Sequence, residues 1–159
     1  MAQTESRSAL TKPIILAALC AGTLDIADAL VFYGQKGVPP ARVLQGISFA
    51  LLGRKAYSMG EAAALLGLCL HFLIATCVAA VYVIASRKLP LSRHPFLYGG
   101  IYGCAVYVAM NYIVLPLSHI GSRPTPPLPA LLNGVIALIL CVGIPTALIT
   151  RAFERSGQR

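Results

Sequence analysis

The sequence predicts an all-α integral membrane protein in which four transmembrane helices form a bundle. Hydrophobic residues make up 57% of the 159 residues and charged residues only 11%, whereas a soluble domain is about 45–50% apolar. The mean hydropathy is +0.76. The apolar residues fall into four long blocks, each able to cross roughly 30 Å of hydrocarbon, with charged, Pro-rich or Gly-rich breaks between them. The solvent predicted for these blocks is lipid.

The first transmembrane helix is predicted at about residues 13–33, after a short polar tail, Met1–Lys12. At 1.5 Å per residue this block is about 31 Å long. It lacks a small-residue cleavage signature followed by a soluble domain, as a signal peptide would have. We therefore expect a helix that is retained in the membrane.

A short helix is predicted next, at about residues 41–53. Its apolar stretch, 47–52, is too short to cross a bilayer. Two prolines at its start, Gly53 as a C′ residue and Arg54-Lys55 beyond fit an interfacial helix that lies on the membrane surface or a re-entrant helix that dips into it. A partly buried connector helix is the alternative.

The other three transmembrane helices are predicted at about 62–86, 96–117 and 128–149, and residues 1–159 form a single membrane domain. Basic residues and prolines mark the ends of these blocks. Gly99 and Gly103 form a small-xxx-small pair, and Ala18 and Gly22 form another, so the backbones of neighbouring helices are expected to approach closely at both pairs.

The distribution of Lys and Arg predicts the orientation. The side that carries both termini holds eight of the 13 basic residues, and the other side holds five. By the positive-inside rule the first side is cytoplasmic. The eight are Arg7, Lys12, Arg87, Lys88, Arg93, Arg151, Arg155 and Arg159, and the five are Lys36, Arg42, Arg54, Lys55 and Arg123.

The net charge of +8 does not indicate nucleic-acid binding, because the basic residues lie in short tethers beside the apolar blocks and not along one amphipathic face. Membrane lipids are their expected partners. The five cysteines all lie inside apolar blocks with no metal-ligand or disulfide spacing, and are expected to pack as small hydrophobic residues.

Asp25 and Asp28 are the residues of the first block that most need an explanation. On the insertion scale a carboxylate at a helix centre costs about 2.5–3.5 kcal/mol, and each strongly apolar residue returns only about 0.3–0.6 kcal/mol. The two share a helix face with Ala18 and Ala21. We expect this face to turn toward the other helices, because lipid offers no hydrogen bond.

His71, Asn111 and Asn133 lie on similar faces of the later blocks. With both termini on one side, these three residues and the two aspartates fall at roughly 5–15 Å below the opposite ends of their helices. The sequence therefore predicts one polar layer. Either it is a hydrogen-bonded clasp that fixes helix register, or it is a protonatable or cation-binding site, in which two carboxyls share a proton and an imidazole relays it.

Other chemistries are less well supported by the residues. A metal site would have only His71 and the two aspartates, and haem ligation by His71, His94 or His119 lacks a facing pair of histidines. There is no GxSxG, HExxH or phosphate-cradling glycine loop, and the loops are too short for a separate catalytic unit. We therefore predict no catalytic residue, no metal and no cofactor.

The stretches Ala21–Asp25, Gly67–Phe72 and Tyr98–Ser118 resemble uncharacterised small bacterial inner-membrane proteins, over most of the four helices. The glycine-rich third helix and the Pro-rich turn after it are more distantly similar to the YagU-like inner-membrane family, whose pattern is larger and has an extra loop region. The resemblance implies a bacterial cytoplasmic membrane and no particular activity.

These observations together predict a protein that is not an enzyme. In one hypothesis the Asp/His/Asn layer supports proton- or cation-linked movement of a small solute. In the alternative the protein is a structural or accessory subunit of a membrane complex, and the layer only fixes helix packing. The partners expected besides lipids are further copies of the chain or subunits of such a complex.

Overall fold

The computed structural model describes residues 2–122, 124 and 126–156, with side chains from Leu10 onward. Arg123 and Arg159, which enter the count of basic residues, lie outside the described residues, as does the side chain of Arg7. Within the described ranges the chain forms helices and no strand. Four helical stretches, Leu10–Gly34, Glu61–Ser86, Pro95–Leu117 and Leu128–Ser156, are long and apolar enough to cross a membrane. The all-α fold with four spans is confirmed.

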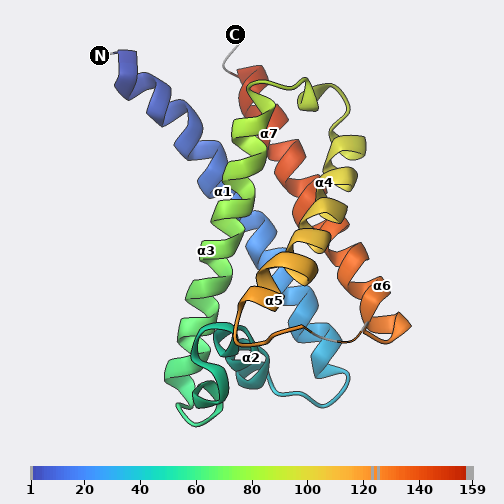
Figure 1. Ribbon diagram of the computed structural model, residues 1–159. Coiled ribbons are helices and arrows are strands. Elements are labelled where there is room, and N and C mark those ends of the chain that lie inside the picture. The colour runs from blue at the N-terminus through green and yellow to red at the C-terminus, as the bar shows by residue number, and fades with distance from the viewer. Residues whose placement is uncertain (1, 123, 125, 157–159) are drawn as a thin grey trace.

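The helices form a bundle whose two ends differ (Figure 1). Helix α1 (Ala2–Gly34) starts at the same end of the bundle at which α7 (Ile144–Ser156) finishes. We call this end the terminal face. Helix α2 (Pro40–Leu52) lies across the opposite end, which we call the α2 face, beside the start of α3 (Glu61–Ser86). The third span comprises α4 (Pro95–Ala109), a π-helical segment and α5 (Leu115–Leu117), and the fourth comprises α6 (Leu128–Ala137), a second π-helical segment and α7.

Two helices extend beyond the predicted spans. Helix α1 starts at Ala2 and includes Pro13, so the polar segment before the first predicted span is helical as well. This segment is rich in Ala, Gln, Glu, Lys and Leu, which are good helix formers, and a helix that has nucleated propagates at little cost. The last helix continues to Ser156, beyond the predicted end at Ile149, because its final turns are polar and can extend into water.

Helix α2 is packed against α3 through polar and small residues. Gln45 and Ser48 are buried, and Gly67 of α3 lies so close that a Cβ atom there would overlap the carbonyl group of Leu44. This packing fits the partly buried connector helix. Gly53 ends α2 with φ +59°, a conformation that favours glycine, and a 3₁₀ turn, Gly53–Tyr57, follows.

The terminal half of the bundle is closed by small residues. Ala17, Ala18 and Ala79 are buried together, with Ile14 and Ile149 packed against them. At Gly99 and Gly103, an added Cβ would come within 2.9 Å of the Gly143 carbonyl oxygen and within 2.6 Å of the Ile139 Cα, respectively. The close approach predicted for the Gly99/Gly103 pair is therefore confirmed.

Two π-helical segments interrupt the third and fourth spans, Met110–Val114 and Leu138–Gly143. In each, the amide that follows the segment bonds to the carbonyl five residues earlier: Leu115 to Met110, and Ile144 to Ile139. Each segment ends two residues before a proline, Pro116 or Pro145. A proline has no N–H and its ring clashes with the carbonyl four residues back, so a wider turn just upstream relieves that contact.

Candidate functional site

A cavity of about 680 Å³ lies in the half of the bundle nearer the α2 face. Its walls come from α1, α2, α3 and α4, both π segments and the connection after α5. Met110 and Val114 of the first π segment, and Leu138 and Val142 of the second, face it. Most of the lining side chains are apolar, and the polar exceptions are Asp25, Tyr33, Arg42, Tyr57 and His71.

His71 is held by a hydrogen bond that fixes its tautomer. Its Nε2 lies 2.8 Å from the backbone carbonyl oxygen of Gly22 on α1. A carbonyl oxygen only accepts hydrogen bonds, so Nε2 carries the proton and Nδ1 is left to accept one. Gly22 makes this approach of α3 feasible, because a Cβ there would lie 2.8 Å from Cε1 of Phe72 and 3.2 Å from the Cβ of Ala75.

Asp25 lies half-buried on the cavity wall. Its carboxyl group is close enough to His71 and Asp28 for their charges to interact. No hydrogen-bond donor among the described residues reaches this carboxyl group. It is therefore available to a proton or to a cationic group within the cavity.

Asp28 is held differently. The side-chain amide of Asn133 on α6 donates to Asp28 Oδ2 over 2.9 Å, and neither residue lines the cavity. This bond joins α1 to the fourth span, as expected of a clasp.

Cys141 also lies within electrostatic range of both aspartates. Sequence analysis did not select it, although it lies eight residues after Asn133, on the same helical stripe.

Asn111 is not brought together with Asp25 and His71 at the cavity. Its side-chain amide donates to the carbonyl of Tyr107 in its own helix, at 3.0 Å, and it does not line the cavity. Asn111 lies in the first π segment, whose turn is wider than that of an α-helix. Met110 and Val114 face the cavity in its place.

Arg42 and two tyrosines form the polar edge of the cavity at the α2 face. The Arg42 guanidinium lies 3.9 Å from the centre of the Tyr57 ring, and its Nη1 is 3.5 Å from Oε1 of Gln45. Gln45 in turn donates to the Gly60 carbonyl at 2.9 Å. These residues were missed because their positions at block ends are equally typical of interface anchors.

Within the described part of the chain, no group of three or more His, Cys, Asp or Glu residues is placed to hold a metal ion. No family model, curated protein or solved structure matches this chain. The cavity, with Asp25 and His71 on its wall, is the basis for the function proposed below.

Proposed function

We propose that this protein is a non-enzymatic membrane carrier or conduit that binds a small, mainly apolar cation in the cavity and exchanges it for a proton at Asp25 and His71. One observation carries the proposal. Asp25 and His71 face the same cavity of about 680 Å³, and the Asp25 carboxyl group has no hydrogen-bond donor among the described residues.

The size and lining of the cavity suggest the class of solute. Small-molecule sites typically enclose about 300–1,000 Å³, with apolar walls and a few polar groups. A carboxylate at hydrocarbon depth costs about 2.5–3.5 kcal/mol on the insertion scale. A proton or a bound cation offsets this cost, so an amphipathic cation of moderate size fits both the walls and the charge.

His71 supplies the proton linkage. With Nε2–H bound to the Gly22 carbonyl, a second proton goes to Nδ1. The resulting imidazolium places a positive charge near Asp25, whose carboxylate interacts with His71. That charge competes with a cationic solute for the carboxylate, so a bound proton favours release of the solute and a bound solute favours release of the proton.

The packing supports entry of the solute from the α2 face. The cavity reaches from Tyr33 and Arg42 at that face to Val78 and Val142 deeper in the bundle. Toward the terminal face, the cluster that contains Ala17, Ala18 and Ala79 excludes a comparable space. With both termini in the cytoplasm of a bacterium, as the Lys and Arg distribution favours, the cavity faces away from the cytoplasm.

A second candidate function is that of an accessory or structural subunit, either as a homo-oligomer or in a larger membrane complex. The Asn133–Asp28 hydrogen bond favours it, because a carboxylate satisfied by an amide on another helix has a packing role. In this case Asp25 and His71 would also serve packing alone.

Transport measurements on purified protein in vesicles separate the two candidates. The vesicles contain trapped pyranine, and a gradient of benzyltrimethylammonium, a permanent cation with one aromatic ring, is applied from outside. We expect the vesicle interior to become alkaline as cation enters and protons leave. Asp25→Asn should slow this exchange at least about tenfold, equivalent to about 1.4 kcal/mol.

Asp28→Asn is the matched control, since it makes the same chemical change three residues away and outside the cavity. We expect it to slow the exchange less than Asp25→Asn does, because only the charge of Asp28 acts on Asp25, and to lower the unfolding temperature, because the hydrogen bond from Asn133 is weakened. If Asp25→Asn exchanges cations as fast as the wild type, or if the wild type shows no exchange, the carrier proposal fails. Thermal unfolding of each variant establishes that it is folded before its rate is compared.

A further inference from the structure

A second pocket, of about 320 Å³, lies at the terminal face, far from the cavity described above. It is lined by Ser92, Arg93, Arg151, Glu154 and Arg155. Arg151, Glu154 and Arg155 belong to the last turns of α7, and Ser92 and Arg93 to the short 3₁₀ helix Leu91–Arg93 between α3 and α4. Three of the five lining residues are therefore arginines.

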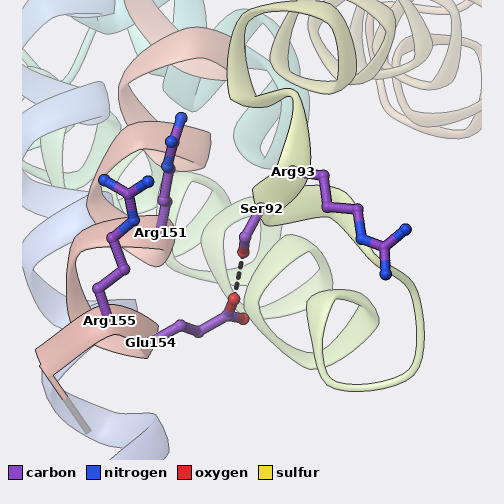
Figure 2. Close-up of a pocket in the computed structure, with 5 residues that line it drawn as sticks. All are labelled: Ser92, Arg93, Arg151, Glu154 and Arg155. Carbon is purple, nitrogen blue, oxygen red and sulfur yellow. Dashed lines mark hydrogen bonds between the residues drawn. The ribbon is translucent and has the colours of Figure 1, made fainter. Parts of the chain in front are cut away.

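The only acidic residue of the pocket is engaged by hydroxyl groups. Ser86, at the end of α3, donates to Oε1 of Glu154 at 2.7 Å, and Ser92 donates to Oε2 (Figure 2). Glu154 thus ties α7 to α3 and to the connection before α4. Its single negative charge offsets only one of the three arginine charges, so the pocket remains positively charged.

The three arginines have no anionic partner among the described residues. None of their side chains forms a hydrogen bond or an ion pair there, although Glu154 lines the same pocket. Figure 2 shows Arg151 and Arg155 on one side of the Ser92–Glu154 hydrogen bond and Arg93 on the other. Arg151 and Arg155 are four residues apart on one helix face, where like charges repel. An anion between them would remove this repulsion.

We propose that this pocket binds the phosphate of an anionic phospholipid headgroup. Guanidinium groups bind phosphate oxygens through paired N–H donors, and arginine is the residue best suited to this geometry. The pocket lies where the hydrocarbon spans end, next to the start of α4. There the side chains of Phe96 and Leu97 are 65% and 58% exposed and offer an apolar surface for acyl chains, which a soluble phosphate would not need.

Native mass spectrometry of the full-length protein tests the proposal, with phosphatidylglycerol as the probe and phosphatidylcholine and inorganic phosphate as competitors. We expect the wild type to retain one phosphatidylglycerol that phosphatidylcholine and inorganic phosphate do not displace. The double variant Arg93→Gln/Arg151→Gln should bind it at least about tenfold more weakly. The matched control, Arg54→Gln/Lys55→Gln, removes two exposed positive charges at the α2 face and should bind within about twofold of the wild type.

Three results would overturn the proposal. Equal losses in the two double variants would mean that overall charge, and not the pocket, attracts the lipid. Displacement of the lipid by inorganic phosphate would make the pocket a site for soluble phosphate. Retention of phosphatidylcholine as firmly as phosphatidylglycerol would remove the role of the arginines. The single variant Arg155→Gln, at an exposed position, provides a milder change if the double variant unfolds, and it should also weaken retention.

Discussion

The hydrogen bond between Asn133 and Asp28 predicts a measurable coupling between α6 and α1. The Asn133 amide donates to Asp28 Oδ2 at 2.9 Å. Hydrogen bonds between membrane helices contribute about 0.6 kcal/mol on average and up to about 1.7 kcal/mol. Bonds to a charged acceptor are roughly twice as strong as neutral ones. We therefore expect a coupling energy of about 1–1.5 kcal/mol for this pair.

A double-mutant cycle measures that energy. Asp28→Ala, Asn133→Ala and the double variant are unfolded reversibly in mixed micelles of dodecyl maltoside and sodium dodecyl sulfate, with helix content followed by circular dichroism. The sum of the two single losses in unfolding free energy should exceed the loss in the double variant by the coupling energy. As a control, the cycle of Asp28→Ala with Asn111→Ala should be additive within about 0.5 kcal/mol, since Asn111 bonds only within its own helix.

An additive result for the Asp28/Asn133 cycle would refute this reasoning. It would mean that the bond does not contribute net stability in a detergent-solvated bundle, and that the carboxylate is satisfied by water in its absence. Coupling of equal size in the Asn111 cycle would also refute it, because the energy would then come from a general property of the bundle and not from this contact.

Two further predictions concern the packing of α2 against α3, and the same unfolding measurement tests both. Gly67→Ala places a Cβ on the Leu44 carbonyl and should lower the unfolding free energy by about 1–3 kcal/mol. The control Gly46→Ala, where an added Cβ has nothing within 4 Å, should raise the unfolding free energy by up to about 1 kcal/mol. The opposite order of the two variants would contradict the packing. Gln45→Ala removes a buried hydrogen bond to a loop carbonyl and should lower the unfolding free energy by about 1 kcal/mol. The control Ser58→Ala, at an exposed position, should change the unfolding free energy by no more than about 0.5 kcal/mol. Equal effects of the two variants would show that the Gln45 bond contributes nothing.

The spans could be predicted closely from the sequence because their signals are local. A long apolar block and the basic or Pro-rich break after it are read without knowing any neighbour. The second span, Glu61–Ser86, and the third, Pro95–Leu117, begin one residue before the predicted bounds and end at them. The Gly99/Gly103 contact was also predictable, since only small residues let backbones meet in lipid.

The division of the polar residues could not be predicted, because it depends on how the helices are turned against one another. Asp25 and Asp28 share a face, yet one lines the cavity and the other bonds to α6. Asn111 was placed with them on the assumption of a regular helix, whereas it lies in a π segment and bonds to Tyr107 of its own span. The cavity itself was not predictable, because its walls come from segments as far apart in the sequence as Gly22 and Val142.

The glycine contacts pack the helices into two tight pairs, and α1 contacts both pairs. Gly67 fastens α2 to α3, and the Gly99–Gly103 stretch fastens α4 to the fourth span. Contacts between backbone atoms cannot be rearranged by a change of side-chain rotamer. We therefore expect the two helices of each pair to move together as one block. Helix α1 meets one block through Gly22 and His71 and the other through Asp28 and Asn133. Any shift of one block against the other must therefore be accommodated at the contacts of α1, where Asp25 lies.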